Sequence, residues 1–343
     1  MGLLSYVGLR RRDQWEPMTL IDHFLSSPLT YIAYLFYHIV LLLRGRPFLP
    51  PRDKPTIHVV CISDTHDLKV DIPRGDILIH AGDLTDAGTV SNIQKQLDWL
   101  KEQPHPVKVV VAGNHDSWFD QKSRPEEDAR SGAKPNMDGL IYLESGLTVQ
   151  KVKGRTVNIF GVPDIPEIGP KEFAFQYATD NHPWLSKVPP QTDILITHCP
   201  PVRSRLEHPS RLQILAAYTS QKHHLDLGLG DSNLLREVWR VKPRLHVFGH
   251  VHYAYGKESV FFDNFQETYE RIMSRPRRGP ILDFIPNEAW LDYLRFLAQG
   301  VHAVAWKWIM SGPGSNNGSL MVNAAQMKGN SGKVKSRAVV VEI

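Results

Sequence analysis

The chain has 343 residues, of which 42% are hydrophobic and 22% charged, a composition typical of a globular protein with a sizeable core. Its formal net charge of +4 is small for this length, and no strong basic stripe is present, so neither nucleic-acid binding nor nuclease activity is expected. The chain has only two cysteines, Cys61 and Cys199. This number excludes a disulfide-rich secreted scaffold and favours a reducing, cytoplasmic compartment.

The first segment, residues 1–54, is predicted to be an arm that precedes the main domain. Three arginines at residues 10–12 come before an apolar run at residues 29–43, and Arg44 and Arg46 follow it. A membrane-spanning helix needs about 20 apolar residues, and this run is shorter. It also lacks the cleavage site of a signal peptide. Two alternatives remain open: a helix that holds the chain at a membrane surface, or a helix packed on the main domain.

The remaining residues, 55–343, are predicted to form one domain of alternating strands and helices. Short apolar runs bounded by turn residues predict strands at residues 57–63, 77–81, 107–112, 156–162, 193–197, 245–248 and 338–343. Helical spacing of apolar residues predicts helices at residues 93–101 and 234–241, the second capped by Asp231 or Ser232. This alternation indicates layers of helices and sheets, an α/β fold.

Two stretches are predicted to be loops because they are rich in turn-forming residues: residues 120–138 and residues 311–337. Between them, in residues 258–310, apolar side chains recur at helical intervals: Trp290, Leu294, Leu297, Val301, Val304 and Trp308. We expect this stripe to face the protein core. A surface that faces a membrane or a partner is the alternative.

Potential metal ligands directly follow five of the predicted strands. They are Asp64 and His66, Asp83, Asn114 and His115, His198, and His250 and His252. Side chains that follow neighbouring parallel strands meet at one edge of a sheet, the usual place of an α/β active site. The mixture of imidazole, carboxylate and amide ligands suits Mn, Fe, Zn or a similar ion, and it lacks the thiolates of a structural zinc site.

These residues form a recognisable series: Asp64-x-His66, Gly82-Asp83, Gly113-Asn114-His115-Asp116, His198 and Gly249-His250-x-His252. The series resembles the calcineurin-like metallophosphoesterases, and all five blocks occur in order over about residues 57–256. The surrounding runs are most similar to those of the metallophosphoesterase-domain-containing phosphodiesterases. The resemblance implies a four-layer α/β/β/α sandwich. The arm and an inserted region at about residues 258–318 would be additions to it.

The resemblance also implies roles for individual residues. Asp64, His66 and His252 would hold one ion, Asn114, His198 and His250 a second ion, and Asp83 would bridge the two. His115 would face the substrate as a catalytic group, and Asp86 would orient it. The cofactors implied are two divalent or transition metal ions, with Mn²⁺ favoured over Fe, Zn, Co or Mg.

The expected function is hydrolysis of phosphate esters by a metal-activated hydroxide, with small nucleotide-like phosphodiesters as substrates. A phosphomonoesterase or a protein phosphatase is an alternative, because the same ions serve both reactions. The block Gly82–Gly88 departs from the sequence typical of protein phosphatases. A non-catalytic scaffold that binds metal and a partner is the third alternative, and no metal ligand is missing to favour it.

Overall fold

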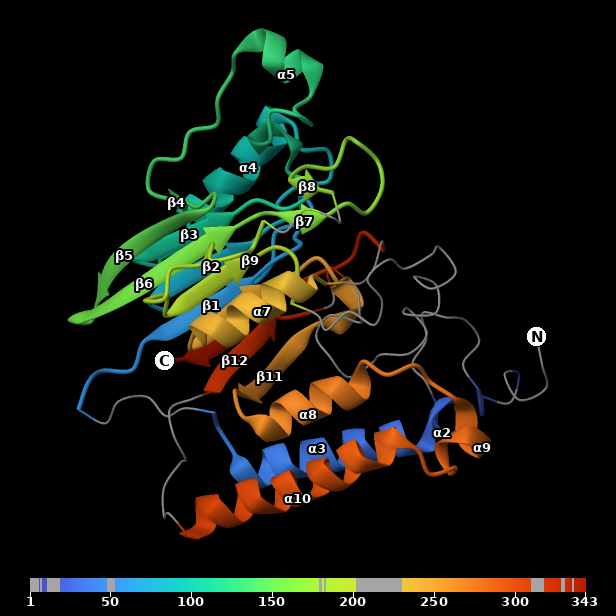
Figure 1. The fold of residues 1–343 in the computed structure, drawn as a ribbon. Helices are drawn as coiled ribbons and strands as arrows, with labels where there is room; N and C mark the ends of the chain where they lie inside the picture. The colour runs from blue at the N-terminus through green and yellow to red at the C-terminus, as the bar shows by residue number, and fades with distance from the viewer. Residues whose placement is uncertain are drawn as a thin grey trace. The chain divides into compact units, whose positions relative to one another are not determined.

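The computed structural model describes residues 6, 8–10, 19–47, 53–178, 181, 183–201, 230–309, 318–327, 331–334 and 336–343, apart from the side chain of Trp308. The chain divides into two compact units. The sheet unit comprises Pro50–Val202, Gly230–Glu258 and Ser319–Ile343. The helical unit comprises Met1–Leu49, Arg203–Leu229 and Ser259–Gly318 (Figure 1).

A five-stranded sheet carries the first predicted strands. Its order is β13-β1-β2-β3-β4, with β1 at His58–Ile62, β2 at Ile77–Ala81, β3 at Val107–Val111, β4 at Ile141–Tyr142 and β13 at Val339–Glu342. Strands β1 to β4 are parallel, and β13 pairs antiparallel with β1. The continuous apolar runs arise because both faces of these central strands are buried.

A second sheet has six strands in the order β11-β12-β10-β9-β6-β5. Their bounds are β5 at Gly146–Val152, β6 at Arg155–Val162, β9 at Ile194–Thr197, β10 at Leu245–Phe248, β11 at Gly256–Phe261 and β12 at Gly318–Asn323. Strands β12, β10, β9 and β6 are parallel to one another, and β5 forms an antiparallel pair with β6. Strand β12 lies inside the stretch 311–337 that was predicted as a loop, so that prediction is wrong for residues 318–323.

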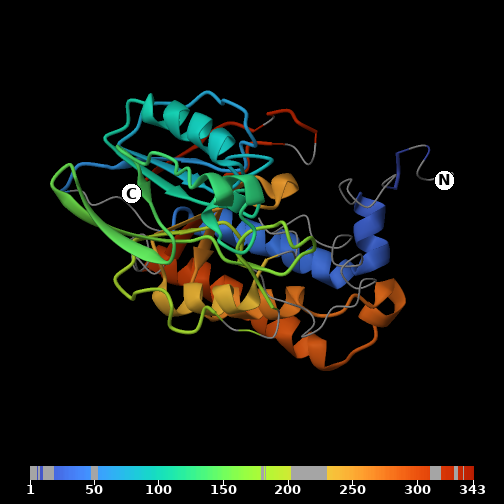
Figure 2. The same ribbon diagram turned by 90° about the horizontal axis from the view of Figure 1, so that it is seen from above.

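The two sheets pack face to face between helices. A Cβ atom added to Gly161 of β6 would stand 2.8 Å from the side chain of Val111 of β3, which shows how closely the sheets approach. Helix α4 (Val90–Lys101) begins after the cap Thr89 and buries Ile93 and Leu97 against the five-stranded sheet. Helix α7 (Ser232–Val241), capped by Asp231, lies on the opposite side of the pair of sheets (Figure 2). The predicted α/β fold with helices flanking two sheets is confirmed.

Short elements complete the sheet unit. They are η1 (Ser117–Phe119), α5 (Glu126–Ser131), the pair β7 (Ile165–Pro166) and β8 (Gln176–Tyr177), and η2 (His252–Ala254). Both cysteines, Cys61 and Cys199, are buried in this unit.

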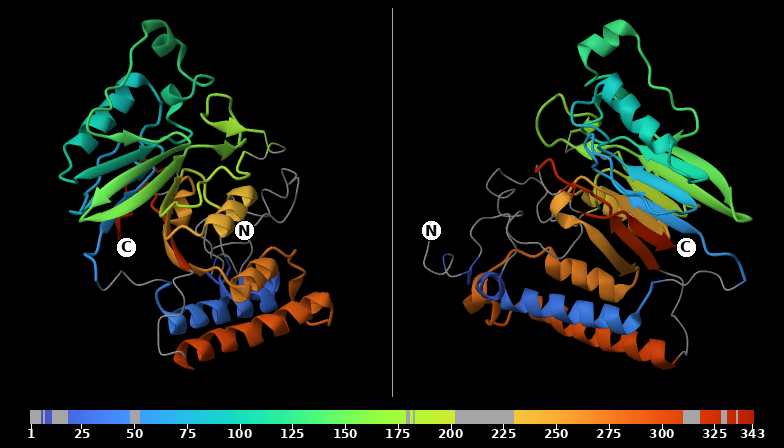
Figure 3. Two further views of the ribbon diagram at one scale, coloured as in Figure 1. Left: turned by 60° about the vertical axis from the view of Figure 1, so that its left-hand side comes forward. Right: turned by 180° about the vertical axis from the view of Figure 1, so that it is seen from behind.

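The helical unit joins the arm to the inserted region. It contains α2 (Leu20–Ser26), α3 (Pro28–Arg44), α8 (Asn264–Met273), α9 (Gly279–Asp283) and α10 (Glu288–Ile309), and α3, α8 and α10 lie side by side (Figure 3). Aromatic rings form its core. Tyr37 stacks on Tyr269 with ring centres 3.7 Å apart, and Phe265 stacks on Phe296 at 4.7 Å. The arm and the inserted region were predicted as additions to the main domain. In the structure they lie in the same compact unit.

The core-facing side of α10 differs from the predicted one. Val304 of the predicted stripe packs against the core, but Leu294, Leu297 and Val301 are exposed, and the core is filled by Phe296 and lined closely by Gly300. The prediction was wrong for these three residues because apolar residues occur all round this helix, so their spacing does not select one face. No helix in the described part of the chain is both long enough and apolar enough to cross a membrane.

Candidate metal centre

The predicted ligands lie on loops that follow strands of both sheets. Asp64 and His66 come after β1, Asp83 after β2, Asn114 after β3, His198 after β9, and His250 and His252 after β10. These strands are parallel within each sheet, so their carboxyl ends bring the loops to one edge. All seven side chains meet there in two groups that share Asp83.

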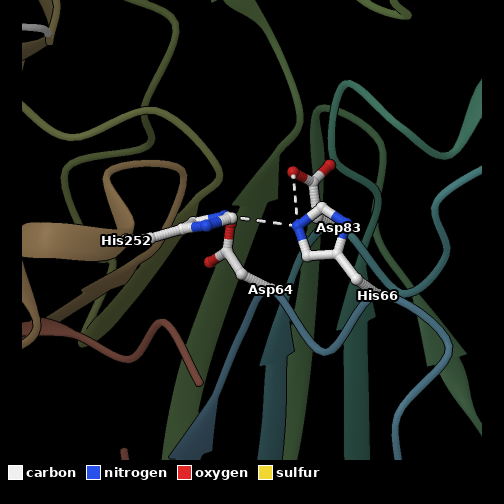
Figure 4. Close-up of side chains that lie close together, drawn as sticks. All are labelled: Asp64, His66, Asp83 and His252. Atoms are coloured by element: carbon white, nitrogen blue, oxygen red, sulfur yellow. Dashed lines mark hydrogen bonds and ion pairs between the residues drawn. The ribbon is translucent and has the colours of Figure 1, made fainter. Parts of the chain in front are cut away.

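The first group consists of Asp64, His66, Asp83 and His252 (Figure 4). The Nε2 atom of His252 lies 3.2 Å from Asp64 Oδ1 and 3.2 Å from the Nε2 atom of His66. His66 Nε2 in turn lies 3.6 Å from Asp83 Oδ2. Ligand atoms that bind one ion at about 2.1 Å stand roughly 3.0–3.4 Å from each other, so this spacing fits a metal ion.

The second group consists of Asp83, Asn114, His198 and His250. The Nε2 atom of His198 lies 3.4 Å from Asp83 Oδ2 and 3.0 Å from Asn114 Oδ1. His250 Nδ1 is 2.9 Å from the same Asn114 oxygen. Asp83 therefore contacts histidines of both groups, which is the arrangement expected of a ligand that bridges two ions.

The charges of the site favour bound cations. Asp64 and Asp83 are buried, and among the described residues neither forms an ion pair with a lysine or an arginine. Burying an unpaired carboxylate costs several kcal/mol. Burial alone would raise the pKa of Asp64, but the hydrogen bond and charge of His252 outweigh burial and lower that pKa to about 2. Both carboxylates thus stay ionised and require positive charge beside them.

The two histidines of the second group differ, because burial lowers the pKa of His250 to about 4. Burial would lower the pKa of His198, but the negative charge of Asp83 outweighs it and raises the pKa to about 9. The Nδ1 atom of His198 donates to the carbonyl of Ala81 at 2.9 Å. In the neutral ring, the Nε2 lone pair therefore faces the oxygens of Asn114 and Asp83, an arrangement that repels unless a cation lies between them. Between the Nε2 atom of His198 and these oxygens, a bound metal ion would take the place of the proton that Asp83 otherwise stabilises.

Four of the seven predicted ligands have a strained backbone conformation. Asp64, His66, Asp83 and His250 have positive φ angles of 53°, 44°, 53° and 66°. Each such non-glycine residue costs about 1–3 kcal/mol, and residues of this kind cluster at functional sites. The backbone of Gly249 lies close to the carboxylate of Asp64 because glycine has no side chain. A Cβ atom on Gly249 would stand 2.1 Å from Asp64 Oδ2.

His115 and Asp86 lie beside the first group, but their contacts differ from the predicted ones. The Asp86 carboxylate accepts a hydrogen bond from Nδ1 of His66 at 2.7 Å, so it orients a metal ligand. His115 donates from Nδ1 to the backbone carbonyl of Asp86 at 3.0 Å, so this contact does not involve its Nε2 atom. The backbone N–H of His115 donates to Asp83 Oδ1 at 2.9 Å and fixes the loop to the bridging carboxylate.

Two residues of the site were given no role from the sequence. Asp116 is fully buried and accepts hydrogen bonds from the N–H groups of Gly113, Leu84 and Thr85, which ties the loop of Asn114 to that of Asp83. Its place directly after His115 was the available signal. Phe173 lies with its ring centre 5.0 Å from that of His115, and its position in a loop far along the chain gave no signal.

Comparison with known proteins agrees with this geometry. The calcineurin-like phosphoesterase family matches residues 57–254, more than half of the chain. The chain belongs to the calcineurin-like phosphoesterase family. It is 30% identical to metallophosphoesterase domain-containing protein 1 of Homo sapiens over 74% of this chain and 80% of that protein. It is 36% identical to a UPF0046 protein of Caenorhabditis elegans over 70% of this chain and 79% of that protein. The predicted resemblance is confirmed.

A further relative is a much longer protein. The chain is 35% identical to the probable rhamnogalacturonate lyase C of Emericella nidulans, over 94% of this chain but only 27% of that protein. The chain thus spans about a quarter of the length of that relative. The family match and the two ligand groups together show a metal-dependent phosphoesterase, a hydrolase that acts on phosphoric esters.

Proposed function

We propose that this calcineurin-like phosphoesterase hydrolyses phosphodiesters of small, nucleotide-like molecules. The observation that carries the proposal is the pair of ligand groups joined by Asp83, with the Nε2 atom of His115 directed away from its own backbone contact. Divalent or transition ions bound there, with Mn²⁺ favoured, would depress the pKa of water and neutralise charge on the phosphoryl oxygens.

The protein's own residues would then orient and protonate the substrate. Asp83 anchors the backbone N–H of His115, so the imidazole has a fixed position relative to both ligand groups. Protonated His115 would donate its Nε2 proton to the departing alkoxide, a contribution that is typically about 10²–10⁴-fold. His66 keeps its Nε2 lone pair toward the ligand group because its Nδ1 proton is held by Asp86.

Phe173 supports a nucleotide-like substrate. Its ring is half-buried and tilted against His115, at the place where the leaving group of a substrate would emerge. Stacking of a base on such an aromatic ring contributes about 1–3 kcal/mol to binding, and it does not depend on which base is bound. A small alkyl phosphate would gain little from the same ring.

The experiment compares hydrolysis of bis-p-nitrophenyl phosphate and p-nitrophenyl phosphate by metal-stripped protein, before and after Mn²⁺ is restored. We expect metal-dependent turnover of the diester and its loss in Asp83→Ala. A preference for the monoester would favour the phosphomonoesterase alternative. No turnover of either ester with two bound ions per chain would favour the non-catalytic scaffold.

A second comparison tests the aromatic part of the proposal. Phe173→Ala removes the ring together with most of the apolar surface of the side chain. Phe173→Leu keeps an apolar side chain without an aromatic face, so it separates the loss of the ring from the loss of apolar surface. We expect both variants to raise KM for diesters with aromatic groups and to leave KM for an alkyl diester unchanged. Equal effects on the two kinds of substrate would contradict a stacking role.

A further inference from the structure

The outward side of α3 is apolar throughout. Its exposed positions recur at helical spacing and hold Ile32, Leu35, Ile39, Leu42 and Leu43. Leu42 exposes 81% of its surface. A helix at the surface of a globular protein normally carries polar side chains at such positions and apolar ones toward the core. Here the opposite side, with Tyr37 and Val40, already fills the core of the helical unit.

Helix α10 extends this surface. Its exposed large apolar side chains are Leu291, Leu294, Leu297, Val301, Trp306 and Ile309. Helices α3 and α10 pack against each other through Phe36 and Phe296, and both pack on α8, so their exposed sides face away from α8. Exposed Ile281 and Leu282 of α9, followed by Phe284 and Ile285, add a third segment. We call these residues of α3, α9 and α10 the apolar face.

This exposure is concentrated in one unit. Of the 28 exposed large apolar side chains in the described part of the chain, 20 belong to the helical unit, although the sheet unit has more than twice as many described residues. Scattered single side chains of this kind are ordinary, but a contiguous apolar patch marks an interaction site.

The charges of the helical unit select the kind of partner. Two of its acidic side chains, Asp22 and Asp292, are buried, and Asp292 pairs with Arg271, Arg275 and Arg295, whereas Glu267 and Glu288 are exposed. Asp263 pairs with Arg44 at the end of α3. The basic side chains of Arg46, Arg278 and Arg295 are exposed. Among the described residues on or next to α3, α9 and α10, these three arginines are exposed against one exposed acid, Glu288, and this excess of positive charge complements an anionic surface.

We propose that the apolar face inserts into one leaflet of a lipid bilayer and holds the protein at its surface. Such helices lie in the plane of the membrane with their apolar side buried about 5–10 Å, in keeping with the finding that no described helix is fit to cross a membrane. The exposed ring of Trp306 suits the level of the headgroups. In a symmetric dimer formed through the apolar face, the exposed arginines of one chain would lie near those of the other and repel them.

The first experiment is flotation of the full-length chain with vesicles of phosphatidylcholine alone and of phosphatidylcholine mixed with phosphatidylserine. We expect binding to both and stronger binding to the mixture. Binding to phosphatidylcholine should persist in high salt, because burial of apolar surface is not screened by ions. Absence of the protein from the vesicle fraction would overturn the proposal.

Substitutions then locate the contact. Leu42→Glu and Val301→Glu each place a charge on an exposed position of the apolar face, so neither removes a core side chain. We expect each to weaken vesicle binding about tenfold and the double variant about a hundredfold. Leu185→Glu is the matched control, because Leu185 is 84% exposed in the sheet unit. It should bind like the parent.

Two further results would overturn the proposal. One is a dimer in the absence of vesicles that dissociates on Leu42→Glu, since a second copy would then cover the apolar face. The other is vesicle binding that high salt abolishes and that both glutamate variants retain. Hydrolysis of a soluble diester should be equal in the parent and the variants, so this test is independent of the proposed reaction.

Discussion

Replacement of Asp86 distinguishes a role in metal binding from a role in proton transfer. The Asp86 carboxylate contacts Nδ1 of His66 at 2.7 Å, and its side chain is 65% exposed, so solvent screens part of its charge. Loss of such a partner of a metal-binding histidine typically costs about 10–100-fold in metal affinity. We expect about tenfold for Asp86→Asn, whose amide oxygen still accepts the hydrogen bond, and closer to a hundredfold for Asp86→Ala.

The assay is a Mn²⁺ titration of metal-stripped protein, followed through hydrolysis of a soluble diester. Both variants should need more Mn²⁺ for half-maximal activity and should approach the parent kcat at saturating metal. Asp71→Asn, which changes an exposed carboxylate in the same loop as His66, is the control and should titrate like the parent. An unchanged titration midpoint with a lowered kcat would refute this reasoning. It would indicate that Asp86 acts in proton transfer by orienting His115.

Four other perturbations have defined outcomes. His115→Asn should slow diesters with alkoxide leaving groups by about 10²–10⁴-fold and p-nitrophenolate esters less; an equal loss in steady-state rates would argue against proton donation. Gly249→Ala places a Cβ 2.1 Å from Asp64 Oδ2 and should reduce the metal content measured by mass spectrometry, so two retained ions would contradict the geometry. Phe296→Ala should lower the free energy of unfolding by about 3–5 kcal/mol in denaturant titrations, and a loss below about 1 kcal/mol would conflict with its packing. Mn²⁺ at a hundred times its Kd should stabilise the parent by about 2.7 kcal/mol in calorimetry, whereas no shift relative to chelator would mean that folding does not preform the site.

The sheets and the ligand loops could be predicted because their signals are local. Buried parallel strands such as 77–81 and 245–248 are continuous apolar runs, and the structure has them with these bounds. A ligand that directly follows such a strand is placed by the strand itself. The positions of Asp83 and His250 in the site could therefore be predicted from the strands that precede them, before their side-chain contacts were known.

Contacts between side chains could not be predicted in the same way. The distance from Asp83 to Asp86 along the chain suits a loop that returns to either His66 or His115, and only the folded backbone selects His66 for the carboxylate. The face of α10 was misassigned because its orientation is set by packing against α3 and α8, which come from distant parts of the sequence. Strand β12 was missed because glycine and asparagine surround it.

The central claim is that two ions at the groups joined by Asp83 make this chain a phosphodiesterase. The most direct measurement titrates metal-stripped protein with Mn²⁺ and records bound ions and diester hydrolysis in the same samples. We expect no hydrolysis without metal and full activity at two bound ions per chain, with Asp83→Ala binding fewer ions and remaining inactive. Diester hydrolysis that persists in chelator, or two bound ions without any hydrolysis, would contradict the claim.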